Sequence, residues 1–152
     1  MRLALFQPDI PQNLGGAIRL TACLGVPLEV IEPCAFPLSD RALRRAAMDY
    51  GDVAQVTRHA GWEDFRTETR KSGARIVLFT TRGAEPFHRF AFREDDVLLF
   101  GRESAGVPDD VHDAADARLV IPIQRGMRSL NLAVSAAIGL AEGLRQTESF
   151  PV

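Results

Sequence analysis

The sequence predicts an α/β fold in which helices cover a parallel β-sheet, and three observations lead to this prediction. Short apolar runs alternate with amphipathic stretches along the chain, at a spacing expected for strand–helix–strand units. The run Ile76–Thr80 is continuously apolar up to its last residue, as expected for a strand buried on both faces. The chain has 152 residues, 46% of them hydrophobic, which is enough for one well-packed core. We therefore expect residues 1–152 to form a single domain.

In the first half of the chain, prolines and glycines separate the predicted elements. The predicted strands are Leu3–Phe6, Leu28–Ile31 and Ala54–Thr57. The predicted helices run from Asn13 to Gly25, from Ser39 or Asp40 through Tyr50, and over Trp62–Lys71. Apolar spacing places one set of residues on the buried side of the first helix: Leu14, Ala17, Ile18, Thr21 and Leu24.

The second half continues the same alternation. Its predicted strands are Ile76–Thr80, Val97–Phe100 and Leu119–Ile123, and Pro108 starts a short helix. The last helix covers Leu130–Gln146 and opens at Ser129. Spacing of three and four residues predicts a buried face made of Leu130, Val134, Ala137, Ile138 and Ala141.

Composition narrows the possible functions without choosing one. The net charge of −2 does not indicate a nucleic-acid partner. Lys71 is the single lysine among 18 basic residues, and arginine suits phosphate binding, although a GC-rich genome explains the same bias. Cys23 and Cys34 form no CxxC pattern and the three histidines are scattered, so we expect no metal site and a reduced, cytoplasmic setting. No apolar run suits a signal peptide or membrane span.

Glycines follow three successive strands of the second half, at Gly83, Gly101 and Gly126. Glycine lets the backbone approach a ligand closely, so three neighbouring loops of this kind predict a pocket lined by main-chain groups. Such a pocket suits a nucleoside-like ligand. The chain has no dinucleotide-binding glycine pattern, no phosphate-binding-loop lysine and no nucleophile elbow, which disfavours hydride transfer and nucleotide hydrolysis.

Three motifs, in order, resemble those of the SPOUT RNA methyltransferases. They are Asn13-x-Gly15-x-x-x-Arg19, Phe100-Gly101-x-Glu103-x-x-Gly106-x-Pro108, and Ile121-Pro122-Ile123 followed by Ser129-Leu130-Asn131. The small size and the run Arg44-Arg45-Ala-Ala-Met-Asp49-Tyr50 resemble one branch, the tRNA (cytidine/uridine) wobble-position 2'-O-methyltransferases. The resemblance extends from about Leu3 to Gln146.

This resemblance implies a three-layer sandwich around a parallel sheet, with a deep C-terminal trefoil knot within about residues 96–146. It implies a homodimer that transfers a methyl group from S-adenosylmethionine to the ribose 2'-hydroxyl of the wobble nucleotide in a tRNA anticodon stem-loop. The implied cofactor-binding residues are Phe79, Thr80, Gly101, Glu103, Ile121, Ile123, Ser129, Leu130 and Asn131.

The resemblance also implies catalytic roles for Arg19 and Asn13, and RNA contacts for Arg19, Arg125 and Arg128. A guanidinium group keeps its proton far above neutral pH, which argues against Arg19 as a general base. We expect Arg19 instead to stabilise negative charge that develops on the 2'-oxygen and to position it. Whether Arg19 acts within its own chain or on the partner's cofactor is left open by the sequence.

Simpler explanations exist for the same residues. Asn13 and Ser129 are good helix caps, and Glu103 suits a surface ion pair with Arg102 or Arg128. Alternative functions are 2'-O-methylation at another tRNA or rRNA site, and a non-catalytic knotted module that binds RNA or a nucleotide.

Overall fold

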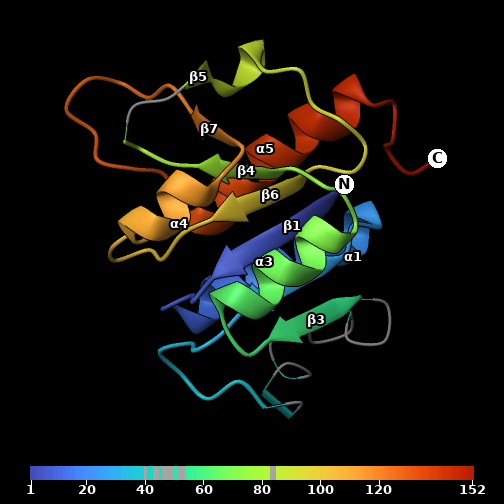
Figure 1. The fold of residues 1–152 in the computed structure, drawn as a ribbon, viewed down its shortest axis with the longest axis vertical. Helices are drawn as coiled ribbons and strands as arrows, with labels where there is room; N and C mark the ends of the chain where they lie inside the picture. Colours follow the sequence, from blue (N-terminus) through green and yellow to red (C-terminus); the bar gives the residue numbers. More distant parts are fainter. Residues whose placement is uncertain (40, 43–44, 46–49, 51–53, 83–84) are drawn as a thin grey trace.

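In the computed structural model, seven strands form one sheet in the order β3-β2-β1-β6-β4-β7-β5 (Figure 1). The structure describes residues 1–39, 41–42, 45, 50, 54–82 and 85–152. The strands are β1 (Arg2–Phe6), β2 (Leu28–Ile31), β3 (Val56–His59), β4 (Ile76–Phe79), β5 (Glu85–Pro86), β6 (Val97–Phe100) and β7 (Ala117–Val120). Every pairing between them is parallel, which confirms the predicted sheet.

Helices cover both faces of the sheet and form three layers. Helices α1 (Pro11–Leu24) and α5 (Leu132–Gln146) share one core cluster with the strands. Helix α3 (Trp62–Lys71) and the short α4 (Asp109–Ala114) pack against the other face through Phe65 and Val111. The central strands β4 and β6 are buried along their whole length, which explains their continuously apolar sequences.

Helix α1 begins earlier than the sequence predicts. Pro11 occupies its first turn, where the fixed φ of proline fits the helix and the missing N–H is not needed. The N-cap residue is Ile10, which makes no side-chain cap, and Asn13 lies buried inside the first turn. The reading of Asn13 as a helix cap is therefore wrong, and its amide is available for other contacts.

The segment around the last helix also differs from the prediction. Strand β7 ends at Val120, so the residues up to Ile123 lie beyond the strand. Helix α5 starts at Leu132, and its N-cap is Asn131, whose side-chain oxygen accepts hydrogen bonds from two backbone N–H groups of the first turn. Ser129 neither caps nor opens the helix.

The buried face of α5 is not the predicted one. Its buried residues are Leu132, Ala136, Gly139, Leu140, Gly143 and Leu144. Val134, predicted as buried, is 48% exposed. The glycines explain the difference, since a Cβ at Gly139 would lie 2.8 Å from Cζ of Phe79. The buried side of the helix therefore combines Gly139 and Gly143 with three leucines, and a prediction that counts apolar residues without the glycines does not identify it.

Smaller elements escaped prediction. The two-residue β5 and the 3₁₀ turn η2 (Phe87–Arg89) are too short to leave a periodic pattern. Strand β3 starts two residues later than predicted, because Val56 pairs with Leu28. The helix predicted through Tyr50 lies largely outside the described residues, and the knot stays a prediction. Within the described parts of the chain, no helix combines the length and apolar character needed to cross a membrane.

Candidate functional site

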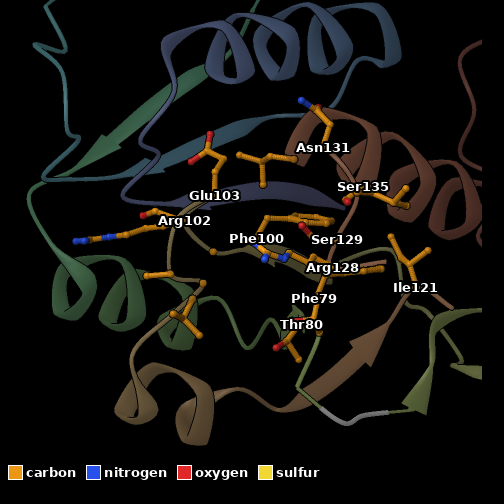
Figure 2. A pocket seen from close by; sticks show the side chains of 18 of the residues that line it. Phe79, Thr80, Phe100, Arg102, Glu103, Ile121, Arg128, Ser129, Asn131 and Ser135 are labelled. Carbon is orange, nitrogen blue, oxygen red and sulfur yellow. The ribbon is translucent and has the colours of Figure 1, made fainter. Parts of the chain in front are cut away.

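A cavity of about 740 Å³ opens at the carboxyl ends of the central strands (Figure 2). Its walls come from the loops that follow β4, β6 and β7, together with the start of α1. Strands β1 and β6 are adjacent although they are distant in sequence, so loops from both halves of the chain meet there. This is the edge at which open parallel sheets usually bind ligands.

All residues predicted to bind the cofactor line this cavity: Phe79, Thr80, Gly101, Glu103, Ile121, Ile123, Ser129, Leu130 and Asn131. Asn13 and Arg128, predicted for catalysis and RNA binding, line it as well. Arg19 and Arg125 are not among its lining residues. The structure thus brings three distant motifs together and leaves two of the predicted arginines outside.

Arg19 lies on the exposed side of α1. It follows Asn13 by six residues, which corresponds to about 9 Å along the helix axis. Its guanidinium carbon lies 5.2 Å from the centroid of the Tyr50 ring, a cation–π arrangement that restricts the side chain.

Arg125 belongs to an exposed segment, residues 122–131, that connects β7 to α5. Gly126 has a φ of +91°, a conformation that other residues rarely adopt, and this places a tight bend between Arg125 and Arg128. Within the described chain, the backbone-to-backbone hydrogen bonds of residues 122–130 are limited to one inside the segment itself, from Met127 N–H to the Gln124 carbonyl. The segment therefore offers unpaired backbone donors and acceptors beside the cavity.

Aromatic side chains form an apolar wall of the cavity. The rings of Phe79 and Phe100 stack with their centroids 4.7 Å apart and a 15° angle between the planes. Both residues line the cavity, and Phe79 also lies close to α5 at Gly139. An apolar wall beside unpaired backbone groups suits a flat heterocycle with polar edges.

A chain of hydrogen bonds joins the three motifs. Glu103 Oε1 accepts a hydrogen bond from Asn13 Nδ2 at 3.0 Å, and Glu103 Oε2 accepts one from the Asp9 backbone N–H at 2.8 Å. Asn13 Oδ1 accepts a hydrogen bond from Asn131 Nδ2 at 2.9 Å. In Figure 2 the Glu103 carboxylate points toward α1, away from Arg128. The expected surface ion pair of Glu103 with Arg102 or Arg128 is therefore replaced by bonds within the site.

Gly101 is needed for the close approach of the β6–α4 loop to itself. A Cβ at this position would lie 2.5 Å from the backbone carbon of Gly106. Arg102 and Gly106 exchange two backbone hydrogen bonds of 2.9 Å, which closes the loop. No larger residue fits without moving backbone atoms.

One arginine at the rim of the cavity is paired with an acidic side chain. Arg82, which lines the cavity, donates a hydrogen bond to Asp109 at 2.7 Å, and this contact lowers the pKa of Asp109.

Burial raises the pKa of Cys34 to about 11, so its thiol is protonated at neutral pH. Nowhere in the described chain do three or more histidine, cysteine, aspartate or glutamate side chains gather as metal ligands would.

Sequence reasoning missed Asp9 and Ser104, which connect the first motif to the second. The Asp9 carboxylate accepts hydrogen bonds from the backbone N–H and the hydroxyl of Ser104. Their proximity depends on the pairing of β1 with β6, which local sequence patterns do not reveal.

Comparison with known proteins gives consistent matches. The model of the SpoU rRNA Methylase family matches residues 1–141. A tRNA (cytidine(34)-2'-O)-methyltransferase of Beijerinckia indica is 56% identical over 144 residues, which cover 95% of this chain and 90% of the relative. A similarly named protein of Ancylobacter novellus is 53% identical and covers 99% of this chain and 95% of the relative.

Solved structures give the same picture. A structure described as giving insights into the 2-OH methylation of C/U34 on tRNA superposes with a TM-score of 0.88 at 41% identity, covering 95% of this chain and 94% of the other. An AdoMet-bound rRNA methyltransferase from Sinorhizobium meliloti superposes with a TM-score of 0.84 at 30% identity, covering 95% of this chain and 55% of the other.

Proposed function

The chain belongs to the SpoU rRNA Methylase family, and from this we propose that it transfers a methyl group from S-adenosylmethionine to the ribose 2'-hydroxyl of tRNA nucleotide 34. The observation that carries the proposal is the convergence of three separated motifs on one cavity. The substrate follows from the relatives that match this chain over nearly its whole length and are named for methylation of cytidine 34.

The residues around the cavity fit the proposed cofactor. The unpaired backbone groups of residues 122–130 suit the edge of an adenine ring, and the stacked Phe79 and Phe100 supply an apolar wall. The other residues of the proposed cofactor site are Thr80, Gly101, Glu103, Ile121, Ile123, Ser129, Leu130 and Asn131. S-adenosylmethionine would supply a methyl group activated by a positively charged sulfonium.

Arg19 and Asn13 have different proposed roles in catalysis, Arg19 through its charge and Asn13 through its fixed position. Arg19 stabilises the negative charge that develops on the ribose 2'-oxygen and orients that oxygen. Asn13 is held by Glu103 and Asn131, which fixes its amide at the cavity wall. Arg125 and Arg128 lie on the exposed segment beside the cavity, where they are available to RNA phosphates.

We further propose that the protein works as a homodimer through α1 and α5. These helices pack against each other, as the 3.1 Å approach between a Cβ at Gly16 and Ala133 illustrates. Val134 and Leu130 leave 48% and 39% of their surface exposed near this seam. Arg19 does not line the cavity of its own chain, so a dimer in which it faces the partner's cavity would complete the site.

The proposal is tested by incubating the protein with bulk tRNA and methyl-labelled S-adenosylmethionine, followed by mass-spectrometric mapping of the modified nucleotide. Label in the 2'-O-methylated nucleotide 34 is the expected result. Label at another ribose, or in rRNA fragments supplied in parallel, would replace the proposed substrate but keep the chemistry. Cofactor binding without transfer to any RNA would favour a non-catalytic module.

A further inference from the structure

Asp9 lies between β1 and α1, immediately behind the wall of the cavity. It is not a cavity-lining residue, whereas Glu103 and Ser104 are. Its backbone N–H donates to Glu103 Oε2 at 2.8 Å. Its carboxylate oxygen Oδ2 accepts hydrogen bonds from the Ser104 backbone N–H at 3.0 Å and from the Ser104 hydroxyl. Asp9 therefore binds two consecutive residues of the β6–α4 loop, Glu103 as a donor and Ser104 as an acceptor of hydrogen bonds.

The β6–α4 loop is closed by its own hydrogen bonds, and the contact with Asp9 sets its position relative to α1. The paired bonds between Arg102 and Gly106, and the absence of space for a side chain at Gly101, preserve its internal shape. The loop leaves the sheet beside the loop that carries Asp9, because Leu5 of β1 lies opposite Phe100 of β6. The contact with Asp9 ties these two loops together.

Glu103 transmits the position of this loop to the rest of the site. Its second carboxylate oxygen accepts a hydrogen bond from Asn13 on α1, and Asn13 in turn accepts one from Asn131 at the start of α5. A shift of the loop would therefore move Glu103 away from Asn13, or pull Asn13 away from Asn131.

We propose that Asp9 is a positioning residue that fastens the β6–α4 loop and so orients Glu103 and Asn13 in the cavity. The inference rests on the proposed function, because the ligand whose binding it affects is S-adenosylmethionine. Asp9 acts through Ser104 and Glu103 and does not itself line the binding site. Hydrogen bonds to a carboxylate are stronger than those between neutral groups, which makes aspartate effective here.

The test compares the affinity of Asp9→Ala, Asp9→Asn and Ser104→Ala for S-adenosylmethionine by titration calorimetry. We expect Asp9→Ala to weaken binding about tenfold, because it removes a charged acceptor of two hydrogen bonds. Asp9→Asn keeps an accepting oxygen and Ser104→Ala keeps the backbone donor, so each should weaken binding only about threefold. Asp95→Ala replaces an exposed aspartate just before β6 and should leave the affinity unchanged.

A second measurement separates positioning from a general loss of stability. Hydrogen exchange of the Ser104 amide, measured without cofactor, should be faster in Asp9→Ala than in the wild type, while amides in the strands stay protected. Equal cofactor affinity in wild type and folded Asp9 variants would overturn the proposal, even if thermal stability fell. Should Asp9→Ala not fold, unchanged affinity in both Asp9→Asn and Ser104→Ala would overturn it. A wild-type protein that does not bind S-adenosylmethionine would refute the proposed function instead, while the amide exchange would still report on the Asp9 contact.

Discussion

Single residues carry most of the chemistry proposed for this site, and Arg19 is the most consequential. Replacing Arg19 with Ala should lower turnover about 100- to 1,000-fold, because one donor to a developing oxyanion contributes about that much. The affinity for S-adenosylmethionine should change little, since Arg19 is proposed to act on the ribose 2'-oxygen and does not line the cavity of its own chain. Single-turnover methylation and calorimetry measure the two effects separately.

Arg70 provides the matched control for this prediction. It is an exposed arginine on α3, so Arg70→Ala removes the same charge without touching the cavity. A parallel fall of turnover and cofactor affinity in Arg19→Ala would contradict the division of roles between this arginine and the cavity.

Asn131 and Ser129 allow a second comparison at the residue scale. Asn131 accepts two backbone hydrogen bonds at the start of α5 and donates one to Asn13. Asn131→Ala should therefore lower the free energy of unfolding by about 1 to 2 kcal/mol. Ser129→Ala should change it by less than about 0.5 kcal/mol, because this exposed side chain caps nothing. Urea denaturation measures both changes in the free energy of unfolding. A larger loss in Ser129→Ala than in Asn131→Ala would mean that Ser129 caps the helix after all.

At the scale of elements, the tight β6–α4 loop sets one wall of the cavity. In Gly101→Ala the new Cβ would press on the Gly106 backbone at 2.5 to 2.9 Å, and backbone atoms yield less readily than a flexible side chain. The strain should lower the free energy of unfolding by about 1 to 3 kcal/mol. The distorted loop should also bind S-adenosylmethionine more weakly by about tenfold or more, as seen by calorimetry.

Gly61→Ala is a suitable control for the loop prediction. Apart from its neighbours along the chain, no described residue comes within 4 Å of a Cβ at Gly61, and its φ of −173° suits any residue. This variant should keep the wild-type affinity for the cofactor. An unchanged affinity in Gly101→Ala would mean that the loop does not shape the binding site.

At the scale of the whole molecule, the proposed dimer has a direct test. Val134 is 48% exposed on α5, close to the packing of α5 against α1. Val134→Arg would bury a charge in the proposed interface, which costs several kcal/mol unless the charge is paired. We expect the wild type to sediment as a dimer and the variant as a folded monomer with little methyltransferase activity. A wild-type monomer with full activity would refute the dimer.

Much of the fold could be predicted because its elements carry strong local patterns. The burial of β4 and β6 makes their sequences continuously apolar, and the predicted limits of β2 and α3 coincide with those observed. The end of β7 and the start of α5 were misplaced, because Ile121 and Leu130 are apolar residues that line a cavity and do not continue a strand or helix.

The residues of the candidate site could be predicted from the sequence, but the contacts among them could not. The motif positions identified the residues that line the cavity, whereas their hydrogen bonds depend on distances between separate loops. Glu103 looked like a partner for a neighbouring arginine and instead accepts hydrogen bonds from Asn13 and the Asp9 backbone. No local pattern relates residues that are 90 or more positions apart.

By itself, the sequence determined the alternation of strands and helices, the parallel sheet and the family. Periodicity and the order of motifs can be recognised in the sequence without knowing how distant segments pack. Only the tertiary structure decided that β1 pairs with β6, that α5 turns its glycines toward the sheet, and that Asp9 meets Ser104. These features depend on how distant segments pack. The lack of a side chain at Gly139 lets α5 approach Phe79, and the Asp9 carboxylate accepts a hydrogen bond from a loop that is far away in the sequence.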